Sequence, residues 1–263
     1  MFAVSFALFV SQSAMATVII FDDFTGTDGT LVRNTTPDPG TGNSWSGSPG
    51  YTITGNAVHS ATTGSGHFVA MDMGAGYFVD NPDVYEISAD LFLSSTMNTP
   101  TDFFSVGFTA GNNTSAGANR THLSTNHATL TGSPSIALRG NGQVAVKVSQ
   151  AETAYISSTG DYAAGSTYNV RVVLDTTLTN WSVAAFVDNT QLDLNGVASG
   201  LLYEYTTNPT IRYASISSGI DSTDSAGSYL DNFQLQTIPE PSTLVLSFLS
   251  LLGFVAVRRK RLA

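Results

Sequence analysis

The side chains best suited to bind a metal ion lie near the two ends of the sequence. Asp22 and Asp23 follow a short β-branched run, and Asp231 and Asn232 lie in a run near the far end. Calcium takes six to eight oxygen ligands, which carboxylates, amides and backbone carbonyls supply. If the two runs are neighbouring strands, these four residues form a structural calcium site that joins the chain ends. In the alternative reading they end their strands and turn into solvent.

Carboxylates on one strand raise a second possibility, the hydrolysis of glycosidic bonds. Glu86 and Asp90 share one face of a predicted strand. At ~3.3 Å per residue they are about 13 Å apart, whereas a retaining glycosidase needs about 5–5.5 Å. No Gly-x-Ser-x-Gly elbow appears between a strand and a helix, and no histidine pair has the helical His-Glu-x-x-His context. The sequence therefore favours a protein without enzyme activity, and a divergent glycoside hydrolase remains an alternative.

Aromatic residues in loops indicate a third chemistry, the binding of sugars. Flat rings stack on the apolar faces of sugar rings, and polar side chains bind the hydroxyl groups. Most aromatic residues of a β-sandwich lie in the core, as we expect for Phe104 and Trp181. The candidates for a ligand-binding role, which are predicted in or near loops, are Trp45, Tyr77, Tyr155, Tyr162 and Tyr203.

The elements that position these side chains are predicted to be β-strands throughout. Residues 84–93 alternate between polar and apolar side chains, as a strand with one solvated face does. Residues 169–175 and 180–188 are predicted to form a hairpin, and residues 51–59 and 67–73 a second strand pair. More than ten short strands separated by turn residues indicate an all-β, two-sheet antiparallel sandwich.

Composition limits the partners of this domain. The chain has no cysteine and a formal net charge of −10. Stability must therefore come from packing, which a bound cation can supplement, because no disulfide can form. Between residues 17 and 237 the one lysine is Lys147. An acidic surface argues against nucleic acid as a partner.

Several short motifs occur in the order found in one fold family. They are Asp22-Asp23-Phe24, Asp28-Gly29-Thr30-Leu31, Trp45, Trp181-Ser182-Val183 and Leu230-Asp231-Asn232-Phe233. This order resembles the concanavalin-A-like lectin/glucanase jelly roll. The resemblance implies that the first and last strands lie side by side, with Asp22 or Asp23 near Asp231. It departs from the laminarinase-type enzymes of this fold, because Glu86, Glu152 and Glu204 lack their Glu-x-Asp-x-x-Glu spacing.

The N-terminus resembles a secretory signal peptide. Residues 2–10 are an apolar core, and Ala14-Met15-Ala16 fits the small-x-small cleavage rule, which gives a signal peptide helix over residues 1–16. No Lys or Arg precedes Arg33, so the positive n-region is missing. A start codon assigned too far downstream accounts for this, and a buried N-terminal strand is the alternative.

The C-terminus contains three distinct pieces. Pro239-Glu240-Pro241 is held extended by its two prolines. Residues 242–257 follow as a single hydrophobic helix of roughly 24 Å, shorter than the bilayer core of about 30 Å. The basic residues that come next, and that hold the chain end on the cytoplasmic side, are Arg258, Arg259, Lys260 and Arg261.

Together these pieces resemble the PEP-CTERM sorting signal. The resemblance implies an exosortase that recognises residues 239–241, cleaves nearby and releases the domain outward. We therefore predict a signal peptide (1–16), a sandwich domain (17–237) and a sorting signal (238–263). The precursor is expected to be exported and transiently tethered in the inner membrane, and the mature domain to be periplasmic, cell-surface or extracellular. Exopolysaccharide glycans are the expected partner, and a structural role with protein partners is the alternative.

Overall fold

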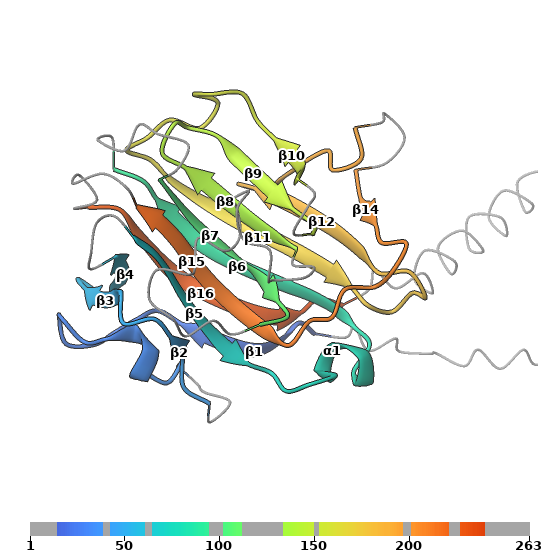
Figure 1. Cartoon of the computed structure of the whole chain (residues 1–263), viewed down its shortest axis with the longest axis horizontal. Coiled ribbons are helices and arrows are strands. Elements are labelled where there is room, and N and C mark those ends of the chain that lie inside the picture. Colours follow the sequence, from blue (N-terminus) through green and yellow to red (C-terminus); the bar gives the residue numbers. More distant parts are fainter. Residues whose placement is uncertain are drawn as a thin grey trace, which may run out of the picture.

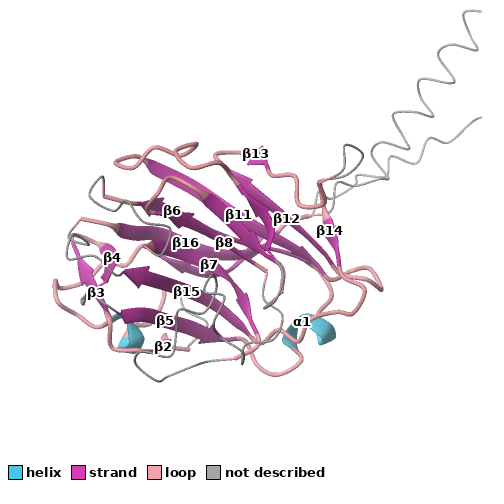
Figure 2. Ribbon diagram, turned by 45° about the horizontal axis from the view of Figure 1, so that its top comes forward, coloured by secondary structure: helices cyan, strands magenta, loops and turns pink. Residues whose placement is uncertain are grey.

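Two antiparallel β-sheets pack face to face in the computed structural model, which describes residues 15–38, 43–60, 65–94, 102–111, 134–149, 153–196, 201–220 and 227–239 (Figures 1 and 2). The predicted all-β sandwich is confirmed. The predicted N-terminal helix, the apolar segment 242–257 and the basic residues 258–261 lie outside the described residues, as do Ala14, Glu152, Glu240 and Pro241.

The larger sheet has nine strands, here called sheet A. Its main path runs β13-β12-β11-β6-β16-β4-β3, with β1 added on β16 and β14 on β12. The strands are β1 (Thr17–Asp22), β3 (Tyr51–Thr54), β4 (Ala57–Ser60), β6 (Val84–Phe92), β11 (Thr167–Asp175), β12 (Ser182–Val187), β13 (Thr190–Gln191), β14 (Tyr203–Glu204) and β16 (Tyr229–Thr237).

The second sheet, sheet B, has seven strands in the order β10-β9-β8-β7-β15-β5-β2. They are β2 (Ser46–Gly47), β5 (Ser65–Asp72), β7 (Phe103–Thr109), β8 (Ser135–Arg139), β9 (Val144–Lys147), β10 (Thr153–Ile156) and β15 (Tyr213–Ile220). The helical elements are η1 (Val32–Asn34) and α1 (Tyr77–Asp80). Within the described residues, no helix has both the length and the apolar character needed to cross a bilayer.

The core between the sheets follows from the period-two pattern of the strands. In β6 the apolar residues Tyr85, Ile87, Ala89 and Leu91 are all buried. The predicted hairpin is also confirmed, because residues 170–175 of β11 pair with all of β12. Its inward side chains are buried on both strands and lie opposite one another as Val170 and Val187, Val172 and Ala185, and Leu174 and Val183. Phe104 and Trp181 lie in the core as predicted.

One predicted strand pair is wrong. Residues 51–59 are not one strand but belong to the β3–β4 hairpin, whose turn residues Gly55 and Asn56 both have positive φ (58° and 60°). A two-residue turn of this kind matches the twist of the paired strands. β5, the expected partner, pairs instead with β15 and β2 in sheet B.

The strands define two ends of the sandwich, which we call the terminal end and the loop end. At the terminal end, β1 begins and β16 ends, with Thr17 opposite Thr237. β6 begins and β11 ends at the same place, with Val84 opposite Asp175. The loop end contains the end of β6 and the start of β11, where Phe92 lies opposite Thr167.

Candidate functional site

The first and last strands lie side by side, as the sequence predicted. β1 pairs antiparallel with β16, and Asp22 lies opposite Phe233. The end of β1 therefore carries Asp22 and Asp23 toward the loop end of sheet A. This pairing confirms the strand arrangement that the predicted calcium site requires. The calcium site itself stays a prediction.

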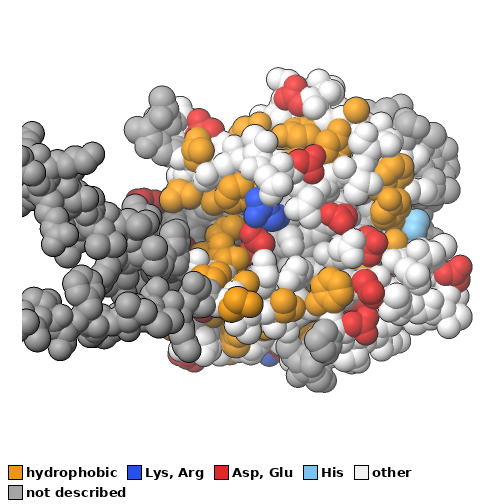
Figure 3. Space-filling model, turned by 180° about the vertical axis from the view of Figure 1, so that it is seen from behind, with side chains coloured by type: hydrophobic (Ala, Val, Ile, Leu, Met, Phe, Trp, Pro, Cys, Tyr) orange, Lys and Arg blue, Asp and Glu red, His pale blue; other side chains and the backbone are white. Residues whose placement is uncertain are grey.

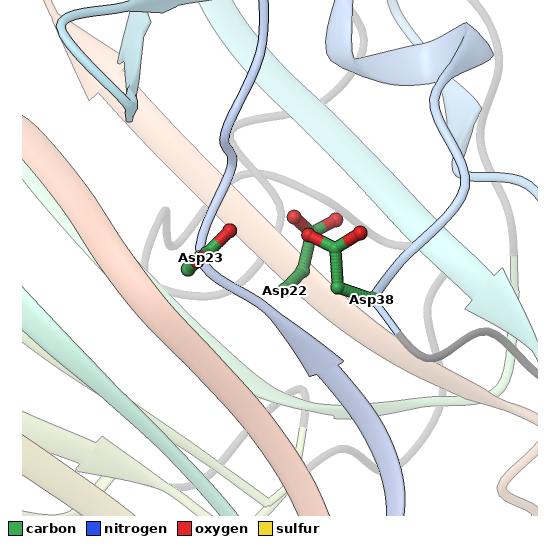
Figure 4. A group of neighbouring side chains, drawn as sticks. All are labelled: Asp22, Asp23 and Asp38. Carbon is green, nitrogen blue, oxygen red and sulfur yellow. The ribbon is translucent and has the colours of Figure 1, made fainter.

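Three acidic side chains meet beyond the end of β1 (Figure 4). One carboxylate oxygen each from Asp22, Asp23 and Asp38 lies within 4.8 Å of the other two. Asp22 and Asp23 come from the β1 end, and Asp38 comes from the loop that follows it. Asp38 was not among the predicted ligands, because Pro37-Asp38-Pro39 lies in a loop with no periodic pattern. Burial decreases from Asp22, which is buried, to Asp38, which is exposed.

Within this cluster, the Asp22 carboxylate accepts hydrogen bonds from two groups of the fold. It is 3% exposed, and its Oδ2 accepts a hydrogen bond of 2.6 Å from the indole N–H of Trp45. Its Oδ1 accepts a second one of 2.8 Å from the backbone N–H of Phe24. Burial raises the pKa of Asp22 to about 6, although these two hydrogen bonds oppose the shift. Each oxygen has a further lone pair, so the carboxylate can still contact a cation.

Asp23 and Asp38 are linked through Thr25. The backbone N–H of Thr25 donates to Asp23 Oδ1 at 3.1 Å, and its hydroxyl donates to Asp38 Oδ2 at 3.4 Å. The hydrogen bond from the Thr25 backbone lowers the pKa of Asp23. The cluster thus combines the buried Asp22, whose pKa is raised, with two more exposed carboxyl groups.

Asp231 and Asn232 face a different partner, Asp90 on β6. Asp231 lies opposite Asp90 in the strand register. The amide of Asn232 donates to Asp90 Oδ2 at 2.9 Å, and the amide of Asn169 donates to Asp90 Oδ1 at 2.8 Å. Burial raises the pKa of Asp231, and the charges of Asp90 and Asp23 add to this. The charge of Asp23 therefore acts on Asp231, whereas the side chain of Asn232 is bonded to Asp90 on β6.

The two carboxylates considered for hydrolysis both have side-chain partners. Glu86 is 5% exposed; its Oε2 pairs with Arg171 at 3.1 Å and its Oε1 accepts from the Gln236 amide at 2.9 Å. Asp90 accepts the two amide hydrogen bonds described above. All four carboxylate oxygens are therefore engaged on the outer face of sheet A.

The predicted ligand role of Trp45 is wrong. Its side chain is 1% exposed, and its ring packs edge-on against Phe233 with 5.1 Å between ring centroids. The loop after β1 folds back so that the indole enters the core and donates to Asp22. A ring in this position cannot stack on a sugar without unfolding.

Two of the predicted tyrosines are separated from the others. Tyr77 lies in α1 and packs edge-on against Phe78 at 5.2 Å. Tyr203 lies in β14 and packs edge-on against Tyr205 at 5.1 Å. Both are half-buried against the core, as are Tyr155, Tyr162 and Tyr168.

The remaining two tyrosines belong to one group at the loop end, which we call the tyrosine patch. It consists of Tyr155, Tyr162 and Tyr168, all half-buried. Tyr162 and Tyr168 meet edge-on at 5.4 Å between ring centroids. Burial raises the pKa of Tyr162, and Tyr155 and the nearby Asp161 add to the shift. Tyr168 was missed by sequence reasoning because it lies inside a strand, where an aromatic residue is expected in the core.

Carboxylates surround this patch. The charges of Asp161 and Asp193 act on Tyr155, and the charge of Asp188 acts on Tyr162, in each case raising the tyrosine pKa after the larger effect of burial. Rings with adjacent carboxylates offer stacking surfaces next to hydrogen-bond acceptors. This is a combination that suits polyhydroxylated ligands.

Comparisons with known proteins agree with this architecture. The family described as a PEP-CTERM protein-sorting motif matches residues 237–260. No curated protein sequence matches the chain. The chain therefore carries a PEP-CTERM sorting motif, directly at the end of β16.

Solved structures of the same fold include binding proteins and an enzyme. The carbohydrate recognition domain of Emp47p is similar with a TM-score of 0.51 and 9% identity, over 84% of this chain and 97% of that one. An endo-1,3-β-glucanase from Streptomyces sioyaensis gives a TM-score of 0.50 and 9% identity, over 88% and 99% of the two chains. The metal-free form of lectin I-B4 from Griffonia simplicifolia gives a TM-score of 0.50 and 9% identity, over 81% and 100%. The described domain therefore has the β-sandwich fold of concanavalin-like lectin and glucanase domains.

Proposed function

We propose that this protein is an exported surface protein, processed by an exosortase at its C-terminal sorting motif, whose sandwich binds polysaccharide outside the cell. The observation that carries the proposal is the position of the motif. It begins at Thr237, the last residue of β16, so nearly all of the motif follows the folded domain, and a cut after Ile238 removes the rest without loss of a strand.

The tyrosine patch is the surface that we assign to the glycan. It lies at the loop end, opposite to the terminal end from which the sorting motif leaves. While the precursor is held at its C-terminus, this placement keeps the patch directed away from the attachment point. The patch can therefore meet extracellular polymers both before and after release.

An uncharged sugar chain suits the electrostatics of this surface. The chain has a formal net charge of −10, and the patch is surrounded by carboxylates. Figure 3 shows a face on which acidic, hydrophobic and uncharged side chains are interspersed and basic side chains cover little area. A polyanionic polymer would be repelled by such a surface, whereas neutral hydroxyl groups can donate to its carboxylates.

Calcium is the cofactor that the acidic cluster fits. Asp22, Asp23 and Asp38 present carboxylate oxygens within 4.8 Å of one another, and oxygen is the ligand type that calcium takes. These residues would hold the ion between the end of β1 and the following loop. A bound cation would offset the mutual repulsion of the three carboxylates and so stabilise the junction of the chain ends.

Binding of polysaccharide is tested by retention of the purified chain on immobilised neutral glycans and on the exopolysaccharide of the native host. Substitution Tyr162→Ala is expected to weaken binding about two- to tenfold, which corresponds to the loss of one stacked ring. Tyr155→Ala is expected to act likewise, and Tyr203→Ala, a half-buried tyrosine of an edge strand, serves as the matched control.

The alternatives give different results in the same assay. Equal retention of all variants, or no retention on any glycan, would support a structural surface protein with protein partners. Turnover of β-glucan by the purified chain, lost in Glu86→Gln, would support a glycoside hydrolase. The glucanase among the similar folds is the reason to include this measurement.

A further inference from the structure

The last residues of β16 are hydrogen-bonded within sheet A on both sides. Gln236 and Thr237 lie opposite Glu86 and Tyr85 of β6. On the other side, the same two residues lie opposite Val18 and Thr17 of β1. β16 is therefore an interior strand up to its last residue, although it comes at the end of the domain.

The chain leaves the sheet abruptly after this point. The backbone N–H of Ile238 still donates to the carbonyl of Val84 at 2.8 Å. Pro239 follows, is exposed, and has no backbone N–H to donate. The change from paired to unpaired backbone thus falls between Ile238 and Pro239.

This boundary decides which peptide bonds a protease can reach. Proteins that bind extended peptides commonly do so by adding the peptide as a strand, which requires unpaired backbone N–H and C=O groups. Residues 234–237 of β16 lie between β1 and β6 and offer no open edge while both of these neighbours are in place. Opening β16 would also expose Phe233 and Leu235, both fully buried in the core, so that opening approaches global unfolding.

We infer that the folded sandwich sets the upstream limit of C-terminal processing, so that the cut falls on the C-terminal side of Ile238. In this reaction water adds across one peptide bond, which leaves a carboxylate on the mature domain and a free amine on the released segment. The mature protein then retains β16 and Ile238 whole. This inference rests on the proposed sorting by an exosortase. It adds that the folded domain determines where the chain can be cut.

Exposed loops of the domain lie at the terminal end, where Pro239 leaves the sheet. Asp83 and Thr176 hold the start of β6 against the turn after β11 through two hydrogen bonds of 3.0 Å. Val79 of α1 and Leu178 of the same turn extend outward, 65% and 59% exposed. Only Ile238 separates Pro239 from the sheet, so the enzyme has to approach close to these loops.

The first test is the intact mass of the protein released by the native host. We expect a C-terminus at Ile238 or beyond. A C-terminus at or before Thr237 would overturn the inference and leave the proposed sorting intact. Recovery of the chain with residues 258–261 still attached would overturn both.

A second test does not depend on the sorting enzyme. Brief digestion of the purified full chain with subtilisin should remove the C-terminal segment and leave a fragment ending at Ile238 or later. Fragments that end within residues 229–237, formed as fast as those that end later, would refute the protection by β16.

A linker variant tests whether the loops at the terminal end restrict the access of the processing enzyme. Inserting Gly-Ser-Gly-Ser between Ile238 and Pro239 should increase the rate of processing in the host severalfold while the upstream limit stays at Ile238. The same insertion in the Gly55–Asn56 turn, at the β3–β4 edge of sheet A, is the control and should leave the rate unchanged. Equal rates for both insertions would show that the neighbouring loops do not restrict access.

Discussion

The substitution Asp22→Asn tests the energetics of the junction between the chain ends. In the folded protein the Asp22 carboxylate is 3% exposed and has two N–H donors, from Trp45 and Phe24. Burial nevertheless raises its pKa to about 6, from an ordinary value of 3.8. The folded state therefore binds this proton more tightly than the unfolded chain does.

The sign of the pH dependence follows directly. The stabilising contribution of the protonated carboxyl group is fully present below about pH 3.8 and is lost as the pH rises through about 6. The difference between the two pKa values corresponds to about 3 kcal/mol of unfolding free energy. Asn cannot ionise, so the variant should lack this contribution to the pH dependence.

The assay is urea unfolding in the presence of a chelator, at several values between about pH 4 and about pH 7. The difference in unfolding free energy between wild type and Asp22→Asn should change by about 2–3 kcal/mol over this range, with the variant favoured at the higher pH. Asp23→Asn is the control of opposite sign. The pKa of Asp23 is lowered, so its stabilisation is present at neutral pH and lost on acidification.

A parallel pH dependence of wild type and Asp22→Asn would refute this reasoning. Calcium provides an internal check, because a cation bound by the cluster would favour the ionised form. With calcium in place of the chelator, the pH dependence due to Asp22 should decrease in the wild type. If calcium changes neither the stability nor its pH dependence, the proposed cation site is wrong.

Two further predictions concern a turn and two ion pairs. Gly142 has φ of 74° and an added Cβ would lie 2.6 Å from a backbone oxygen, whereas Gly160, with φ of 84°, has open space there. Gly142→Ala should therefore destabilise the protein in urea unfolding by about 1–3 kcal/mol more than Gly160→Ala does, and equal losses would contradict the predicted clash. Arg171→Met leaves the buried Glu86 without its cation and should cost about 1–3 kcal/mol in the same assay. Arg212→Met breaks an exposed pair and should cost less than about 1 kcal/mol, so the opposite ranking would contradict this account.

Elements with a clear period were predictable from the sequence. The alternation in β6 and the pairing of β11 with β12 follow from apolar residues at every second position, since a strand turns these to one face. The neighbouring positions of β1 and β16 followed from the resemblance of ordered motifs to a known fold. In each of these cases, local pattern and global fold agree.

One error was local and the others were long-range. Gly55-Asn56 between two β runs is a two-residue hairpin signal, and the prediction of a single strand over residues 51–59 overlooked the turn that the positive φ of both residues confirms. Trp45 lies in a polar loop, which indicates exposure, yet the Asp22 carboxylate satisfies its N–H inside the core. Asp38 joins the acidic cluster through the path of the same loop. No local pattern encodes that path.

The side-by-side position of Thr17 and Thr237 has a consequence for protein engineering. Backbones of neighbouring strands are about 4.8 Å apart, so a short turn can join the two ends of the mature domain into a continuous chain. New ends can then be opened at the tight Gly55–Asn56 hairpin, which gives a circular permutant with every strand retained. In such a permutant a fusion partner attached at the new ends would emerge from the β3–β4 edge of sheet A instead of from the terminal end.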